Sequence, residues 1–102
     1  MSQRSRTLQE TTTTLTPADT LVAAKQFFAR QNGVYSAFPE QESPNHLTLR
    51  GQGGEEIVIG AFPFNGMTKV SGSTYLFDQQ VARFLSSLPP TPVAEVVEAA
   101  KP

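Results

Sequence analysis

The dipeptide Asn65-Gly66 constrains the fold of this chain more than any other sequence feature, because it separates two runs rich in β-branched and aromatic residues. Both residues tolerate the positive φ angles that a two-residue type I′ hairpin requires. The runs 55–64 and 67–77 are therefore predicted to be antiparallel strands joined by this turn. Such a turn sets Ala61 directly opposite Val70.

The loop before this hairpin decides which side chains share a face of the sheet. A strand predicted over 46–51 is followed by a glycine-rich loop that can turn with two residues or with three. A two-residue turn would pair Ile57 with Arg50. A three-residue turn pairs Ile57 with Leu49, and Arg50 with Glu56. We favour the three-residue turn, because a slip of one residue moves every side chain to the other face and this register gathers the aliphatic side chains together.

The three-residue turn gives the sheet two chemically different faces. The first, here the aliphatic face, carries Leu47, Leu49, Ile57, Ile59, Ala61, Val70 and Leu76. The second, here the mixed face, carries His46, Thr48, Arg50, Glu56, Val58, Phe62, Lys69, Ser71, Ser73 and Tyr75. We expect helices to cover the aliphatic face. The mixed face is too polar for a core and too aromatic for an ordinary wet surface.

Two segments with apolar residues at helical spacing lie on either side of the strand-rich region. The first starts at Thr16-Pro17, where Thr can cap a helix and Pro suits its first turn, and a helix is predicted over 16–31. The second helix is predicted over 78–88, with Asp78 as its cap. The core-facing residues are Leu21, Ala24, Phe27 and Phe28 in the first helix and Val81, Phe84, Leu85 and Leu88 in the second.

Two further segments complete the predicted sheet. The threonine-rich segment 5–14 favours an opening strand, with a disordered arm as the alternative. Val34–Pro39 is expected to be the first strand of an antiparallel meander. The segment 39–44 after it, which holds Glu40 and Glu42, is expected to be a flexible acidic loop.

These elements predict an α+β fold of two layers, with an antiparallel meander sheet of four to five strands and helices 16–31 and 78–88 packed on one face. A chain of 102 residues fits a single domain, here 5–89, with a flexible N-terminus over 1–4. Residues 90–102 are expected to form a Pro-rich linker and a tail. The tail can form a short helix with Val93, Val96 and Val97 on one side.

The composition excludes several classes of protein. The net charge is -1 and the basic residues are spread from Arg4 to Lys101, so a nucleic-acid surface is not expected. The absence of cysteine excludes disulfides, thiol catalysis and cysteine-ligated metals. No stretch approaches the roughly 18 apolar residues of a membrane-spanning helix, and no apolar run follows the first arginines. We therefore expect a cytoplasmic protein without a membrane span.

No motif assigns a catalytic residue, a metal or a cofactor. His46 is the only histidine, and without cysteine a zinc site would need carboxylates alone. Ser71 and Ser73 share its face, but no G-x-S-x-G nucleophile elbow accompanies them. The glycine-rich segment 51–56 joins two strands and ends in two glutamates, so it is interpreted as a turn and not as a phosphate-binding loop.

The order of strand, helix, four strands and helix over 5–89 resembles a shortened helix-grip domain of the START and polyketide-cyclase-like superfamily. The segments that carry this resemblance are 15–18, 67–73 and the closing helix from Asp78. The resemblance implies a small apolar ligand or a cyclase-like activity, but it assigns no functional residue. If the chain has this function, we expect Tyr75, Ser71, Ser73 and His46 to line a pocket under a helix. The same order also resembles one half of a TATA-binding-protein saddle, without its basic and wedge-forming residues.

The sequence favours a non-enzymatic binding or assembly module over this ligand-binding alternative. The mixed face is expected to pack against a second copy or another protein. The candidate contact residues are Val58, Phe62 and Tyr75 at its centre, with Arg50, Lys69 and His46 around them. The C-terminal segment with Val93, Val96 and Val97 is predicted to dock in the same assembly, because an amphipathic helix can lay its apolar side into a groove.

Overall fold

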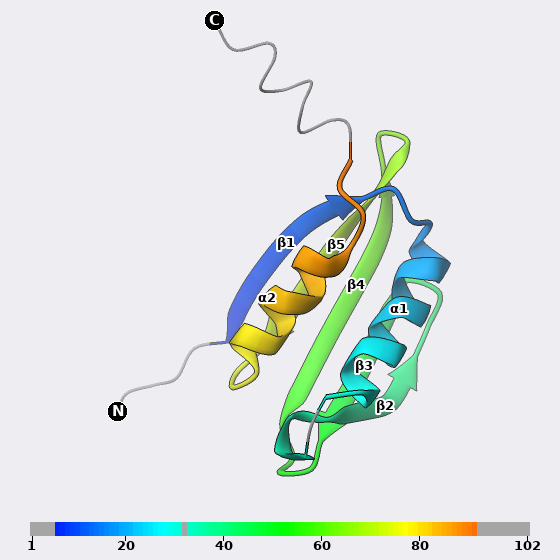
Figure 1. The fold of residues 1–102 in the computed structure, drawn as a ribbon. Coiled ribbons are helices and arrows are strands. Elements are labelled where there is room, and N and C mark those ends of the chain that lie inside the picture. The colour runs from blue at the N-terminus through cyan, green and yellow to red at the C-terminus, as the bar shows by residue number, and fades with distance from the viewer. Residues whose placement is uncertain (1–5, 32, 92–102) are drawn as a thin grey trace, which may run out of the picture.

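A computed structural model of the chain describes residues 6–31 and 33–91. Its elements are β1 (Thr7–Thr13), α1 (Pro17–Ala29), the 3₁₀ turn η1 (Gly33–Tyr35), β2 (Ala37–Glu42), β3 (His46–Gly51), β4 (Glu56–Phe64), β5 (Met67–Thr74) and α2 (Asp78–Ser87). The strands form one antiparallel sheet in the order β1-β5-β4-β3-β2, and both helices lie on one of its faces (Figure 1). The predicted α+β class and the opening strand are confirmed.

Both turns that flank β4 have the predicted lengths. Asn65 and Gly66 have φ angles of 53° and 79°, and the pair Phe64–Met67 closes the two-residue turn between β4 and β5. On the other side, the Gly51 N–H donates to the Glu55 carbonyl at 2.7 Å, which closes the three-residue turn. The register that follows from the two turns is the expected one, because β3 and β4 place aliphatic residues opposite each other.

The core lies between the aliphatic face and the two helices. Its strand residues are fully or almost fully buried, namely Ala37, Leu47, Leu49, Ile57, Ile59, Ala61 and Val70. Helix α1 packs over β4 and β2, whereas α2 packs over β5 and β1. Phe28 of α1 and Phe84 of α2 have ring centroids 5.5 Å apart, so the two helices also pack against each other through the core.

The start of α1 follows the predicted capping chemistry. The Thr16 hydroxyl accepts a hydrogen bond from the Asp19 N–H at 3.0 Å, and Pro17 is the first helical residue. The helix ends at Ala29, two residues before the predicted boundary, since its last backbone bonds tighten around Arg30. The capped start leaves the apolar side of α1 directed at the sheet.

Gly72 lets α2 approach the sheet closely. A Cβ atom placed on Gly72 would lie 2.5 Å from Cγ1 of Val81, which is closer than carbon atoms can pack. The glycine in β5 therefore makes room for the first apolar side chain of α2. Val81 itself is fully buried.

The predicted strand Val34–Pro39 is wrong at both ends. Gly33 has a φ of 44°, and the Ser36 N–H and hydroxyl both donate to its carbonyl, at 3.1 and 2.9 Å, so this segment closes the 3₁₀ turn η1. Strand β2 begins only at Ala37 and continues to Glu42. Pro39 is tolerated because β2 is an edge strand with an irregularity beside it.

The flexible acidic loop predicted for Glu40 and Glu42 is also wrong, since both residues belong to β2. Glu42 pairs with Lys25 of α1 at 2.9 Å on the helix side of the sheet. Glu40 pairs with Arg50 of β3. Each carboxylate thus has a cationic partner on a neighbouring element.

The last strand ends earlier than predicted, and this removes Leu76 from the aliphatic face. Strand β5 stops at Thr74, whose hydroxyl accepts a hydrogen bond from the Phe77 N–H at 3.4 Å. The resulting turn interrupts the alternation of side chains. Phe77 is buried in the core, and Leu76 is exposed.

Asp78 does not cap α2 as predicted. The capping position is Phe77, whose backbone carbonyl accepts from the Val81 N–H at 2.9 Å, and no side chain caps the helix. Asp78 is the first helical residue, where its charge suits the helix dipole. Its carboxylate accepts a hydrogen bond from the Thr7 hydroxyl at 3.0 Å and so ties α2 to β1.

We predict that Gly72→Ala lowers the free energy of unfolding by about 1–3 kcal/mol, because the added methyl group overpacks the contact with Val81. In a Val81→Ala background the same substitution is expected to cost much less, since the clashing methyl group is gone. Urea denaturation of the four proteins in this cycle measures both effects. An equal cost of Gly72→Ala in both backgrounds would contradict the close contact.

Candidate functional site

The mixed face is the candidate site, because within residues 6–31 and 33–91 neither helix covers it (Figure 1). Its register adds two aromatic side chains to those expected, Phe38 of β2 and Phe64 of β4. Phe38, Phe62, Phe64 and Tyr75 are between 42% and 50% exposed. A sheet face of this kind combines exposed rings with charged groups.

One row of side chains runs across the whole sheet at the end where β4 begins. Strand register places Phe38 beside Arg50, and Arg50 beside Glu56. Tyr75 follows the last residue of β5 and lines the same hollow as Glu56, and the Arg6 guanidinium lies 4.9 Å from the centre of the Tyr75 ring. The row therefore crosses from β2 to the residue that precedes β1.

Four charged groups at this end of the mixed face, here called the charge row, alternate in sign across the sheet: Arg6, Glu56, Arg50 and Glu40, the last of which lies two residues beyond Phe38 on β2 and reaches Arg50 with its carboxylate. Arg6 Nη1 lies 2.9 Å from Glu56 Oε1. Arg50 Nη2 lies 3.8 Å from Glu56 Oε2 and 2.7 Å from Glu40 Oε1. The sequence predicted the central pair, and the structure extends it by one charge on each side.

Arg6 is held by more than its ion pair. Its Nε donates to the Ser73 hydroxyl at 2.6 Å, and its Nη2 donates to the Ser73 carbonyl at 3.1 Å. The guanidinium carbon also lies 4.9 Å from the centre of the Tyr75 ring. Hydrogen bonding and the cation–π contact thus hold Arg6 over β5 and direct it at Glu56.

Arg50 is held from three sides. Its Nε and Nη2 both donate to Glu40 Oε1, and its Nη1 donates to the Gly54 carbonyl at 3.1 Å. The hydrogen bonds to Glu40, together with the charges of Glu40 and Glu56, raise the pKa of Arg50 against a smaller opposing effect of burial. The guanidinium is therefore a permanent positive charge at the centre of the row.

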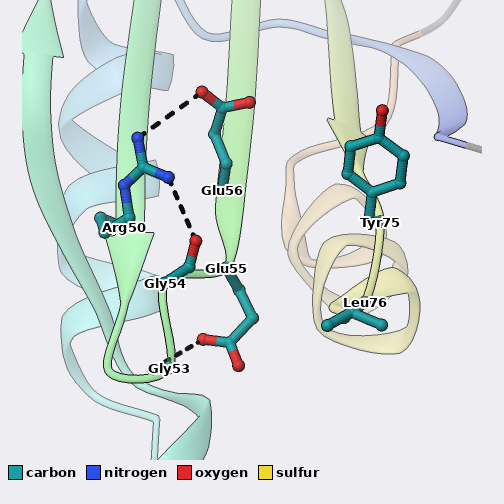
Figure 2. A pocket seen from close by; sticks show the side chains of 7 residues that line it. All are labelled: Arg50, Gly53, Gly54, Glu55, Glu56, Tyr75 and Leu76. Atoms are coloured by element: carbon teal, nitrogen blue, oxygen red, sulfur yellow. Dashed lines mark hydrogen bonds and ion pairs between the residues drawn. The ribbon is translucent and has the colours of Figure 1, made fainter.

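A hollow of about 320 Å³ opens beside the charge row (Figure 2). It is lined by Arg50, Gly53, Gly54, Glu55, Glu56, Tyr75 and Leu76. Figure 2 shows Arg50 and Glu56 on one side of the hollow and Tyr75 and Leu76 on the other. Glu55 turns back to accept from the Gly53 N–H at 3.0 Å, which stabilises the turn that forms one wall.

The other half of the mixed face is aromatic. The ring of Phe62 lies over Gly60, where an added Cβ would come within 3.3 Å of it. His46 meets the Phe62 ring at a centroid distance of 5.1 Å and an interplanar angle of 75°, an edge-on arrangement. Gly60 makes room on the sheet for the Ser71 hydroxyl and these rings, because an added Cβ would crowd all three side chains.

Lys69 and Phe64 complete this aromatic half. Lys69 Nζ lies 5.4 Å from the centre of the Phe64 ring and 3.7 Å from Glu10 Oε1. Val58 is half-buried between the charge row and the Phe62 cluster. The predicted contact residues Arg50, Val58, Phe62, Lys69, Tyr75 and His46 thus share one face, but they fall into two clusters.

Within residues 6–31 and 33–91 no helix covers Tyr75, Ser71, Ser73 and His46, since these residues lie on the mixed face and both described helices lie on the aliphatic face. Ser71 and His46 flank Gly60 on opposite sides, and a Cβ added to Gly60 would lie 2.8 Å from the Ser71 hydroxyl and 3.5 Å from His46 Cδ2. Among the described residues no hydrogen bond joins the two side chains, so they do not form the contact that a serine nucleophile and its base require.

Sequence reasoning missed Arg6, Phe38, Glu40 and Phe64 as members of the mixed face. Glu40 was missed because the strand predicted over 34–39 ended one residue before it. Phe38 lay inside that predicted strand, but no pairing with the neighbouring strand was assigned to it. Arg6 was missed because it precedes a strand whose pairing partner, β5, is more than sixty positions away in the sequence. The alternation of Glu10, Leu8 and Arg6 at every second position was a usable signal, since it places all three on one face of β1.

Two further observations bear on the site. In the part of the chain that the structure describes, no group of three or more His, Asp or Glu side chains is placed to hold a metal ion. No helix there has the length and apolar character needed to cross a membrane. The predicted docking residues Val93, Val96 and Val97 lie outside the described residues, as does the N-terminal segment 1–4.

Comparison of the chain with protein-family models, with curated proteins and with solved structures found no match. Function is therefore inferred from the mixed face itself.

We predict that Arg6 and Glu56 are coupled by about 0.3–1 kcal/mol, as half-exposed ion pairs with good hydrogen-bond geometry are. A double-mutant cycle with Arg6→Gln and Glu56→Gln, measured by urea denaturation at low salt, gives this coupling. It should shrink in 1 M NaCl because salt screens exposed charges. The matched control is the looser pair Lys69–Glu10, for which we expect a coupling near zero. Equal coupling in both pairs would contradict an ordered charge row.

Proposed function

We propose that this chain is a small non-enzymatic binding or assembly protein whose mixed face contacts a protein, either another chain or a second copy. One observation carries this proposal. A whole face of the sheet, uncovered by the helices of the described residues, holds the half-exposed rings of Phe38, Phe62, Phe64 and Tyr75. Groups of exposed apolar side chains are uncommon on monomeric proteins and mark interaction surfaces.

The charged groups on the mixed face support the same function. Arginine and tyrosine, like tryptophan, are enriched among the side chains that dominate binding energy at interfaces. Arg6 lies against Tyr75, and Arg50 is held by Glu40 and the Gly54 carbonyl. Because these side chains are already held in place, contact with a partner would cost less conformational entropy.

The arrangement supports binding better than catalysis. Each charge of the charge row is paired with its neighbours in the row, as in a structural ion-pair network. The only histidine packs edge-on against Phe62, and the serines of the same face lie on the far side of Gly60 or beside Arg6. The polar side chains of the mixed face therefore hold one another in place, which suits a binding surface.

We predict that a photo-crosslinking residue at position 62 captures a partner. p-Benzoylphenylalanine in place of Phe62 keeps an aromatic ring on the mixed face, and irradiation of cells of the source organism should give adducts of defined mass. The matched control is the same residue in place of Val22, which is similarly exposed but lies on α1. In pull-downs with tagged protein, Phe62→Asp should reduce partner recovery at least tenfold, and Val22→Asp should not.

The absence of any adduct at position 62 above the level at position 22 would contradict the proposed function. Adducts that contain a second copy of this chain and adducts that contain another protein both support it.

A further inference from the structure

We infer that the partner of the mixed face is a second copy of this chain, related by a two-fold axis that runs parallel to the strands between β3 and β4. This inference rests on the proposed function and specifies its partner. The observation that carries it is the alternation of charge in the charge row. Four charges in the order plus, minus, plus, minus become minus, plus, minus, plus when the row is reversed. A copy turned by 180° therefore presents an anion to every cation.

The strand register specifies which residues would face each other. In a two-fold contact the same patch is used by both copies, so residues exchange roles across the axis. Strands β3 and β4 pair Arg50 with Glu56, and Thr48 with Val58. With the axis between these strands, Arg50 lies over Glu56 of the second copy, and Thr48 lies over Val58 of the second copy.

The outer members of the charge row match as well. Arg6 is held over β5 by Ser73 and directed at β4, whereas Glu40 lies on β2 beside Arg50 of β3. A two-fold axis between β3 and β4 places β5 of one copy over β2 of the other. The Arg6 guanidinium of each copy therefore faces Glu40 of the other, and complementary charges of this kind specify orientation in an interface.

The aromatic groups also fall in complementary places. Phe38 of β2 and Tyr75 beyond β5 lie at the same level of the sheet, so reversal places one over the other. The edge-on pair of His46 and Phe62 lies near the axis and meets its own copy there. Stacked sheets pack about 10 Å apart, which these rings can span.

The size of the contact predicts a weak dimer. Four overlapping strands, β2 to β5, give a footprint of roughly 19 by 23 Å from ordinary strand spacing and rise, or about 900 Å² over both copies. This is at the lower end of specific protein interfaces, where association is transient. We therefore expect a dissociation constant in the micromolar range or weaker. Strand β1 would extend beyond the overlap on each side, which leaves the 64% exposed side chain of Leu8 uncovered.

Reversal of all four charges gives a direct test. The variant with Arg6→Glu, Glu56→Arg, Arg50→Glu and Glu40→Arg keeps the alternation within one chain and leaves the net charge unchanged. Its self-association should have a dissociation constant within about threefold of that of wild type. The variant should bind wild type at least tenfold more weakly, because like charges then face each other. Sedimentation velocity with fluorescently labelled wild type, titrated with either unlabelled protein, measures both affinities.

If the variant binds wild type as tightly as wild type binds itself, the two-fold arrangement is wrong. Circular dichroism and thermal unfolding establish that the variant is folded.

If the variant does not fold, a second measurement tests the two-fold arrangement in the wild-type chain. The chain has no cysteine, so Thr48→Cys can carry a single nitroxide label and be mixed with unlabelled ¹⁵N wild type. We expect at least a twofold loss of amide signal at Val58 and Gly60 and none along α1. A label at Val22→Cys is the control, and broadening confined to β1 or to the helices would overturn the proposal.

The two proposals fail separately. A wild-type chain that stays monomeric at 1 mM overturns the two-fold dimer. Adducts of another protein at position 62 then still support the proposed function. The absence of every adduct overturns the proposed function together with the dimer.

Discussion

The pairing of β4 with β3 and β5 is the constraint on which the rest of this structure depends. The turns on its two sides fix the register, and the register assigns every side chain of three strands to a face. A slip of one residue at the turn between β3 and β4 would place Leu49 in solvent and Arg50 in the core, and a slip at the turn between β4 and β5 would do the same to Val70 and Lys69. The cost of burying a charge without a partner then excludes the slipped arrangement. The hydrophobic core and the charge row are therefore two results of one pairing.

The helices depend on the same register through Gly72. Because β5 pairs with β4 as it does, Gly72 lies on the aliphatic face, where the absence of a side chain admits Val81 of α2. Phe84, one turn further along α2, then reaches Phe28 of α1. Burial of these aromatic rings supplies much of the apolar area that stabilises a small domain. Because both described helices pack on the aliphatic face, neither of them covers the mixed face.

Gly60 makes room for side chains on the mixed face, as Gly72 makes room for α2 on the aliphatic face. It gives space to a ring of its own strand, since Phe62 folds over it and reaches His46. The charge row provides the polar counterpart, with each charge held by a neighbouring strand. Aromatic rings and paired charges on one face of a sheet favour contact with a protein surface of similar character. An alternating row is also complementary to its own reversal, which is the physical basis for a two-fold assembly.

The sequence alone determined the α+β class, the two turns beside β4, the register of β3 to β5, the cap of α1 and the apolar sides of both helical segments. These features depend on residues close together in the chain, where turn chemistry and side-chain periodicity are strong signals. Only the tertiary structure decided the bounds of β2, the turn that buries Phe77 and exposes Leu76, and the completion of the charge row. Arg6 and Glu40 join this row through pairings between the edge strands and the centre of the sheet. Arg6 lies fifty positions from Glu56 in the sequence, and no local pattern links residues so far apart.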